Sequence, residues 1–568
     1  MTEAALQELH TTTSVSTTPG RSAAGVDRPL LARPSVWHAG VRVSASLRVP
    51  ARAGRVLTWT GLSLACLALG AFLKLPEAVE TPGTDTGLYA TYGHLLLQGA
   101  RPYVDFWDIH PPLVFGYWAL VDALTGPDWL RTCFTINGLV PQSCTGSLAH
   151  VVDLLLSVAA ALVTARIARL AGGSRVAATL AAVSVVGFAD QVLLSNEGSN
   201  PSKLTLLPSV VALWAYLRSL AAARGRHWAG VAGVAAAIAG LAKQPALLTL
   251  TALVIHAAWQ RDAARARAVL AGSGSVFLVV CATFAVVGSL DGFVAQVWLY
   301  NVERSFAGYF VHPVKEPGIT LGRVVTEGAG LLAVGGLAGA AILAIRPHHA
   351  SQRLLLSWSV VNAVAVLAFR EFVYVVPSLA VVGALAVDRA WRWANRRGTL
   401  HAVLGACLLG AMGLVTIRST TPFQQVQMAR ARGERGPGGG LSQPEELGRI
   451  LRRDGAPGAL FVYGNAAELY PLAERVPAAP YLNAEALRAS APQAARARAE
   501  LVATLERTHP PVIVLAPHDD EPELDLAAYP ALRWFLQGCY RRQPINAVFD
   551  RSWTVLVSTR DCGRLARS

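Results

Sequence analysis

Long apolar runs separated by short arginine-rich segments dominate the chain, and this pattern restricts it to a membrane-spanning fold. A transmembrane helix needs about 20 mostly apolar residues. Only 15% of the residues are charged, against about a quarter in soluble domains. We therefore predict a polytopic α-helical membrane protein with about eleven transmembrane helices. The candidate runs lie near residues 56–75, 148–170, 176–192, 204–220, 228–243, 246–260, 268–289, 326–345, 354–369, 373–390 and 399–417.

The arginines lie before the first apolar run and after every second run that follows. An excess of basic residues marks the cytoplasmic side of a membrane protein. The amino terminus is therefore predicted inside the cell membrane, with residues after about 418 outside. These loops account for the net charge of +14, so no nucleic-acid partner is expected. The predicted cytoplasmic basic residues include Arg52, Arg55, Arg166, Arg169, Arg175, Arg218, Arg224, Arg226, Arg261, Arg265, Arg267, Arg346, Arg353, Arg392, Arg396 and Arg397.

Composition divides the chain into four parts. Residues 1–50 are rich in Ser, Thr, Ala and Arg, which predicts a disordered cytoplasmic tail. Residues 51–417 form the predicted membrane domain, whose first outer loop spans 76–147. A Gly-rich linker over 418–440 precedes residues 441–568, where short β-rich runs alternate with helical stretches. This last part is predicted to be a small extracytoplasmic α/β domain. Its expected strands are 459–463, 512–515 and 553–558, with a helix over 491–508.

Four of the seven cysteines fall in predicted outer segments, where disulfides can persist. They are Cys133, Cys144, Cys539 and Cys562. Pairing Cys133 with Cys144 and Cys539 with Cys562 is the simplest arrangement, although sequence does not determine connectivity. The other three lie within apolar runs and are expected to be small buried hydrophobic residues.

The first outer loop contains the most distinctive polar pattern. Asp85 lies in Thr-Asp-Thr-Gly-Leu-Tyr at the start of a short helical stretch, and Leu88, Tyr92 and Leu95 fall on one face of it. That periodicity predicts a helix along the membrane surface. Gly-Ala-Arg-Pro-Tyr-Val-Asp follows at 99–105, and Ile-His-Pro-Pro-Leu follows at 109–113.

This ordered pattern resembles the first outer loop of the integral-membrane glycosyltransferases of the GT-C type, which use polyprenyl-phosphate sugars. Similar groups are the protein O-mannosyltransferases, the aminoarabinose transferase of lipid A, and the bacterial RgtA/B/C/D-like group. The resemblance continues at Leu-Ser-Asn-Glu over 194–197, at Gly-Leu-Ala-Lys over 240–243 and at Phe-Val-Tyr over 372–374. It extends over roughly residues 55–390.

The resemblance implies that Asp85 is the catalytic base and that Glu197 is a second acidic residue facing the same cavity. A carboxylate can take the proton of an acceptor hydroxyl while that hydroxyl attacks the anomeric carbon. Asp is also among the best helix N-cap residues, so the alternative for Asp85 is a cap. The alternative for Glu197 is an ordinary solvated turn.

The resemblance also implies that His110, Arg131 and Lys243 contact the donor phosphate. His110 stands where many relatives carry Lys, and the alternative is a structural loop histidine. Lys243 is one of only four lysines, and its alternative is snorkelling to the membrane interface. Arg131 has a similar alternative as an interfacial anchor.

We therefore expect a cell-membrane glycosyltransferase that transfers a sugar from a polyprenyl-phosphate donor to a glycan, lipid or protein acceptor on the outer face, with inversion. No metal or cofactor is expected, because Asp-Phe-Trp-Asp at 105–108 and His-Asp-Asp-Glu at 518–521 lack a complete ligand set. The rival enzyme class is a lipid-diphosphate-dependent oligosaccharyltransferase or glycan ligase, and the rival from another class is a membrane transporter or flippase.

Overall fold

The computed structural model describes the chain from residue 51 to residue 559 with several internal gaps. The chain divides into two units, Met1–Arg55 and Val56–Ser568, and the description below concerns the second. The expected tail, 1–50, and the expected linker, 418–440, lie outside the described residues. The described ranges are 51–78, 84–125, 147–189, 200–222, 225–303, 330–345, 350–369, 372–397, 443–488, 492–516, 525–543 and 553–559.

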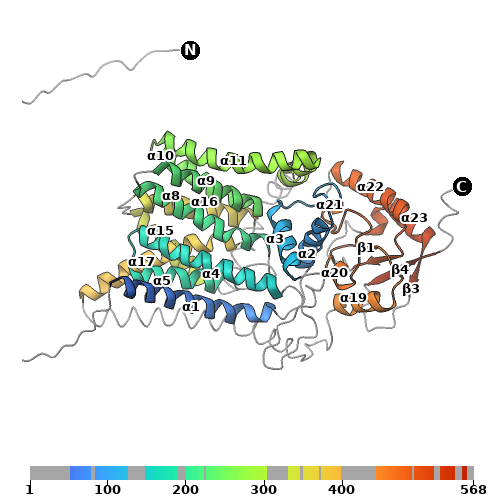
Figure 1. Cartoon of the computed structure of the whole chain (residues 1–568), viewed down its shortest axis with the longest axis horizontal. Coiled ribbons are helices and arrows are strands. Elements are labelled where there is room, and N and C mark those ends of the chain that lie inside the picture. Colours follow the sequence, from blue (N-terminus) through green and yellow to red (C-terminus); the bar gives the residue numbers. More distant parts are fainter. Residues whose placement is uncertain are drawn as a thin grey trace, which may run out of the picture. The chain divides into compact units, whose positions relative to one another are not determined.

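Helices account for the amino-terminal two thirds of the described chain (Figure 1). Each apolar run predicted before residue 398 coincides with a helix, whereas the run at 399–417 lies outside the described residues. Among the described residues, three helices, at 149–170, 201–221 and 263–287, are long and apolar enough to cross a membrane. The helices are α1 (Ala51–Ala78), α2 (Thr84–Leu97), α3 (Leu113–Thr125), α4 (Ser147–Leu170), α5 (Arg175–Ala189), α7 (Pro201–Leu204), α8 (Leu206–Ala221), α9 (Gly225–Ala242), η1 (Gln244–Leu247), α10 (Leu248–Trp259), α11 (Ala263–Val287), α12 (Leu290–Phe293), η2 (Val294–Leu299), α15 (Gly330–Ile345), α16 (Ala350–Phe369), η3 (Phe372–Tyr374) and α17 (Val376–Arg397).

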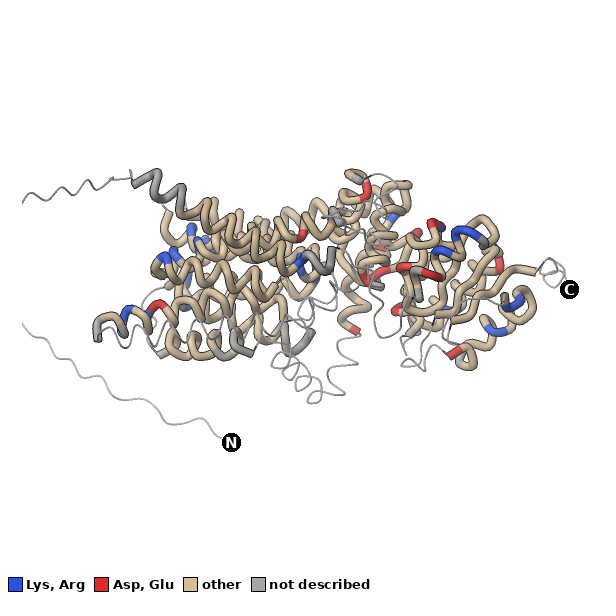
Figure 2. Tube along the Cα trace, turned by 90° about the horizontal axis from the view of Figure 1, so that it is seen from below, with Lys and Arg blue, Asp and Glu red and all other residues tan. Residues whose placement is uncertain are grey.

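Small residues let the long helices pack closely. A Cβ added at Gly233 of α9 would collide with the Val269 carbonyl of α11, and one at Gly272 of α11 would collide with the Gly230 carbonyl. Close approach at small residues is the usual way in which helices pack in a membrane. Figure 2 shows the charged residues at the ends of the helical part and over the carboxy-terminal part, with a long uncharged stretch between them. That distribution suits an apolar slab bounded by two polar regions.

Residues 443–559 form a mixed α/β arrangement, called here the C-terminal α/β segment. Its four-stranded sheet has the order β1-β2-β4-β3. β1 (Leu460–Tyr463) and β2 (Val512–Leu515) are parallel, with Leu460 opposite Val512. β4 (Thr554–Ser558) is antiparallel to β2 and to β3 (Tyr540–Gln543). The helices are α19 (Gln443–Asp454), α20 (Leu469–Leu472), α21 (Glu485–Arg488), α22 (Pro492–Thr508), η5 (Leu526–Ala528) and α23 (Pro530–Cys539).

The strands differ in how readily their sequence predicts them. β1 and β2 are apolar throughout and almost wholly buried, as expected for parallel strands covered on both faces. The expected strands at 459–463, 512–515 and 553–558 are therefore confirmed within a residue at each end. β3 was not predicted. Its sequence, Tyr-Arg-Arg-Gln, is polar because β3 is an edge strand whose arginines face solvent.

The predicted first outer loop and the C-terminal α/β segment share one hydrophobic core. Leu88 of α2 and Phe115 of α3 belong to the same buried cluster as Leu447 of α19, Val462 of β1 and Val514 of β2. Figure 1 shows α2 and α3 between the long helices and this segment. The segment is thus packed against the loop that carries the candidate site.

Only one of the four cysteines expected to form disulfides lies within the described residues. Cys539 is disulfide-bonded, whereas Cys66 and Cys281 are free thiols within apolar helices. Cys133, Cys144 and Cys562 lie outside the described residues. The pairings Cys133 with Cys144 and Cys539 with Cys562 stay predictions.

Candidate functional site

Helix α2, which carries Asp85, is buried on more than one face. Leu88, Tyr89, Ala90 and Tyr92 are all buried, because α2 packs between α3 and α20. We had expected a surface helix with one apolar face, and the structure instead inserts this helix between other elements. Asp85 is exposed within the first turn, where a negative charge interacts favourably with the helix dipole.

Asp85 does not act as a side-chain cap in the described part of the chain. No hydrogen bond or ion pair joins its carboxylate to any residue that the structure describes, and it lies inside the helix rather than before it. Its carboxylate is therefore exposed to solvent and accessible to a ligand.

The Gly-x-x-Pro-Tyr-x-Asp motif is a structured turn. Gly99 ends α2 with φ of 88°, a conformation that glycine adopts without strain. The Asp105 carboxylate accepts from the Arg101 backbone amide at 2.7 Å and forms an ion pair with the Arg101 guanidinium at 3.1 Å. Tyr103 has φ of 65°, which is rare and costly for a bulky residue.

In this strained conformation, Tyr103 forms hydrogen bonds that hold the neighbouring loop. Its hydroxyl donates to the His110 carbonyl at 2.8 Å, and its own carbonyl accepts from Gln296 at 2.9 Å. Gly292 leaves room for this close approach, since a Cβ there would collide with the Tyr103 carbonyl. The motif therefore positions the segment that ends at His110.

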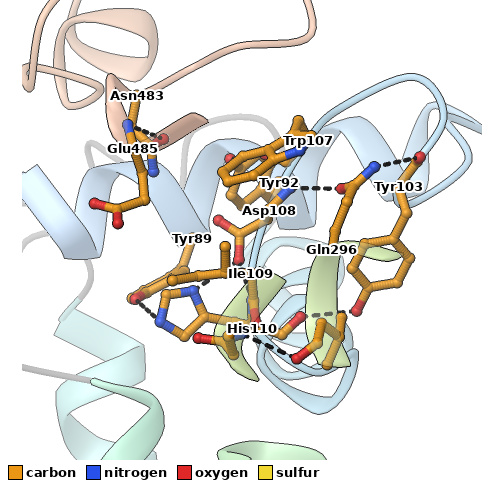
Figure 3. A network of polar contacts seen from close by, with 12 residues as sticks. Tyr89, Tyr92, Tyr103, Trp107, Asp108, Ile109, His110, Gln296, Asn483 and Glu485 are labelled. Atoms are coloured by element: carbon orange, nitrogen blue, oxygen red, sulfur yellow. Dashed lines mark hydrogen bonds and ion pairs between the residues drawn. The ribbon is translucent and has the colours of Figure 1, made fainter. Parts of the chain in front are cut away.

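His110 and Asp108 form the central polar pair of the site (Figure 3). One Asp108 carboxylate oxygen, Oδ1, accepts from the His110 amide at 2.6 Å and lies 2.7 Å from His110 Nδ1. The Asp108 side chain is fully buried, and that of His110 is 16% exposed. His110 Nε2 lies 3.1 Å from the Tyr89 hydroxyl. Both ring nitrogens of His110 thus have partners.

Three amide side chains hold the backbone of this pair in place. Gln296 accepts from the Asp108 amide at 3.1 Å. Gln244 and Asn301 both donate to the Ile109 carbonyl, at 2.8 Å and 3.0 Å. These contacts come from segments that are distant in the sequence, and they hold the loop rigidly, as a site that depends on geometry requires.

Lys243 is brought close to the same loop, because its neighbour Gln244 binds the Ile109 carbonyl. The Lys243 ammonium donates to the Ser202 hydroxyl at 3.1 Å. Lys203, beside Ser202, is also buried, and sequence reasoning did not single it out. Two lysines near one polar patch favour an anionic ligand at this end of the helices.

Two of the predicted site residues cannot be placed. Glu197 and Arg131 lie outside the described residues, and their roles stay predictions. The described part of the chain brings together three segments, those that carry Asp85, His110 and Lys243. It adds Asp108 and Tyr89, which the sequence had not assigned. The sequence did contain a signal for Asp108, because a carboxylate two residues before His110 can pair with the imidazole. The sequence analysis considered Asp108 only as a possible metal ligand.

The C-terminal α/β segment contacts the candidate site in three places. The Trp107 amide donates to the Pro480 carbonyl at 3.0 Å, and the Tyr300 hydroxyl donates to the Glu485 carbonyl at 3.0 Å. Gly87 of α2 lies against Glu468, so that an added Cβ would meet the Glu468 backbone. Figure 3 shows the Glu485 side chain reaching toward the side where the Tyr89 hydroxyl lies.

Two buried tyrosines near Asp108 have raised pKa values. Burial, followed by the Asp108 charge, raises the pKa of Tyr92 and of Tyr103 well above the ordinary value. Both hydroxyls therefore stay protonated and donate, Tyr92 to the Trp107 carbonyl at 2.8 Å and Tyr103 to the His110 carbonyl. Within the described ranges, no group of three or more His, Cys, Asp or Glu side chains is arranged to hold a metal ion.

Comparison with solved structures identifies proteins of similar fold. The oligosaccharyltransferase of Archaeoglobus fulgidus, in a complex with Zn and sulfate, matches 86% of this chain and 72% of its own, with a TM-score of 0.52 and 14% identity. The same archaeal protein, AglB, in complex with an inhibitory peptide and a dolichol-phosphate, matches with a TM-score of 0.51 and 14% identity over 89% of this chain and 75% of its own. ArnT of Cupriavidus metallidurans, bound to undecaprenyl phosphate, has a TM-score of 0.49 and 14% identity over 90% of this chain and 99% of its own.

No protein-family model and no curated protein matches the sequence. The likeness to the archaeal structures, at such low identity, shows a shared fold. It confirms at the level of the fold the resemblance to GT-C membrane glycosyltransferases.

Proposed function

We propose that this chain, which has the fold of a membrane oligosaccharyltransferase, is a glycosyltransferase that takes a sugar from a polyprenyl-phosphate donor at the outer face of the membrane. The observation that carries the proposal is the grouping of the Asp85 helix, the Asp108–His110 loop and the Lys243–Gln244 segment at one end of the helices. The three segments carry the exposed Asp85 carboxylate, the His110 imidazole and the Lys243 ammonium. A carboxylate and cationic groups are the two kinds of group that transfer from a lipid phosphate requires.

In the proposed reaction the Asp85 carboxylate takes the proton of the acceptor hydroxyl. The hydroxyl oxygen forms a bond to the anomeric carbon, and the bond from that carbon to the donor phosphate oxygen breaks. The lipid phosphate leaves with the electron pair, and the configuration inverts because attack and departure occur on opposite faces. General-base catalysis of this kind contributes about 10²- to 10⁴-fold in rate.

Cationic groups would stabilise the charge that develops on the departing phosphate. His110 and Lys243 are the described candidates, and the proposed set also includes Arg131 as a third phosphate ligand and Glu197 as a second acidic residue. The archaeal neighbour has been seen with a dolichol-phosphate, which supports a polyprenyl carrier for this fold. The acceptor is proposed to be a glycan, lipid or protein of the cell envelope.

A second candidate is transfer from a lipid diphosphate, which the likeness to an oligosaccharyltransferase favours. The two reactions release different lipids. A monophosphate-linked donor releases a polyprenyl phosphate, whereas a diphosphate-linked donor releases a polyprenyl diphosphate.

Mass spectrometry of the released lipid separates the candidates. Purified protein in lipid nanodiscs would be given a mixture of polyprenyl-phosphate and polyprenyl-diphosphate sugars together with a cell-envelope extract. We expect release of polyprenyl monophosphate only, and about 10²- to 10⁴-fold slower release by an Asp85→Asn variant. Release of polyprenyl diphosphate would replace the proposed donor, and turnover of neither donor would contradict the glycosyltransferase proposal.

A further inference from the structure

Asp108 is a buried charge that the proposed reaction does not use. Its side chain has no exposed surface, and one carboxylate oxygen, Oδ2, has no hydrogen-bond partner among the described residues. A buried carboxylate is costly unless it is paired. In the described part of the chain, the ion-pair partner of Asp108 is His110, at 2.7 Å.

The pair fixes the orientation of the His110 ring. Asp108 Oδ1 accepts from the His110 amide and holds Nδ1, so the ring cannot turn over without breaking two contacts. Tyr89 engages Nε2 from the opposite side, with its ring edge-on at a centroid distance of 5.1 Å. When both nitrogens carry protons, each proton has an acceptor, and the buried negative charge is neutralised.

The other charged and titratable groups around the ring do not replace Asp108. Tyr103 contacts only the His110 carbonyl with its hydroxyl, and Lys243 reaches this loop only through its neighbour Gln244. Glu485 of α21 lies on the Tyr89 side in Figure 3. Asp85 is one helical turn before Tyr89 on α2.

Resting on the proposed function, we infer that Asp108 is a positioning residue that holds His110 as a fixed imidazolium for a phosphate oxygen of the lipid carrier. The His110 side chain is 16% exposed, and since both ring nitrogens have protein partners, its attraction for a phosphate oxygen would come from its positive charge. A lysine carries its charge without assistance, whereas an imidazole titrates near neutrality and depends on a neighbouring carboxylate to stay charged. With histidine rather than lysine at position 110, a neighbouring carboxylate is needed to keep the side chain charged, and the buried Asp108 is that carboxylate.

The test is a double-mutant cycle. The affinity of each full-length variant for decaprenyl phosphate is measured by titration calorimetry. In the parent background, Asp108→Asn should weaken binding by about tenfold or more, the scale for removing one partner of a buried charge pair. In a His110→Lys background, Asp108→Asn should change binding by less than about threefold, because lysine does not need the carboxylate. Asp262→Asn, at the cap of α11, is the matched loss of one carboxylate and should leave binding unchanged.

A purely structural role for Asp108 predicts an equal loss in both backgrounds, and that result would overturn the inference while leaving the proposed function intact. Failure of the parent to bind decaprenyl phosphate would overturn the proposed donor and this inference together. If Asp108→Asn does not fold, the pH dependence decides. Parent binding should weaken as the pH rises while His110→Lys binding stays level, and an equal fall in both would overturn the inference.

Discussion

Both ring nitrogens of His110 are engaged, although the sequence had suggested a histidine open to a ligand. The local sequence could not reveal this arrangement, since Asp108 and His110 face each other only in one loop conformation. That conformation depends on Gln244 and Gln296, which are far along the chain. The types of the site residues were therefore predictable from the sequence, whereas their partners were not.

At the residue scale, the charge of Asp85 is expected to matter more than its effect on helix α2. Asp85→Asn removes the interaction of one exposed charge with the helix dipole, worth about 0.3–1 kcal/mol, so it should keep the fold. It removes the proton acceptor, which should lower turnover about 10²- to 10⁴-fold, or roughly 3–5 kcal/mol of barrier. The measurement is sugar transfer from a synthetic polyprenyl-phosphate sugar by protein of unchanged Tm. Retention of more than about a tenth of the parental turnover would show that Asp85 is not the base.

At the scale of elements, the membrane helices were predictable because their signal is local. A run of apolar residues identifies a buried helix whatever surrounds it. Helix α2 was harder to interpret, because its burial against α20 depends on residues near the other end of the chain. The edge strand β3 was missed for a similar reason, since only its pairing with β4 makes it a strand.

The contact between α2 and α20 should not tolerate a side chain at Gly87. Gly87→Ala would place a methyl group against the Glu468 backbone, and such overpacking costs about 1–3 kcal/mol. Thermal unfolding in detergent should show a lower Tm, and sugar transfer should fall with it. Gly116→Ala in α3 is the matched control, because nothing lies within 4 Å of the added atom. A normal Tm for Gly87→Ala would show that α2 and α20 are not packed tightly together.

At the scale of the whole molecule, the arginine pattern, the apolar helices and the α/β segment together predict one orientation. The orientation is a proposal. It depends on the excess of arginines in alternate loops between the helices, and no contact within the protein bears on it. The order of the helices follows from the sequence. How the C-terminal α/β segment packs against the first outer loop required the structure, because their shared core joins residues from both parts of the chain.

The proposed orientation can be tested with introduced thiols at two exposed arginines. Arg541 lies on the edge strand β3, and Arg261 lies in the turn between α10 and α11. A membrane-impermeant thiol reagent applied to intact cells should label Arg541→Cys and spare Arg261→Cys. The unsubstituted protein shows the background from native cysteines. The opposite labelling pattern would place the candidate site on the cytoplasmic side.

Because Gly87 packs against Glu468, a segment that the ribosome makes early waits for one made near the end. At about 5–20 residues per second, the interval between them is on the order of tens of seconds. Throughout that time α2 already carries Asp85, yet it lacks the neighbour that covers it. A chain released before Glu468 would hold the first outer loop without its cover. The packing of α2 is therefore complete only after most of the chain has been made.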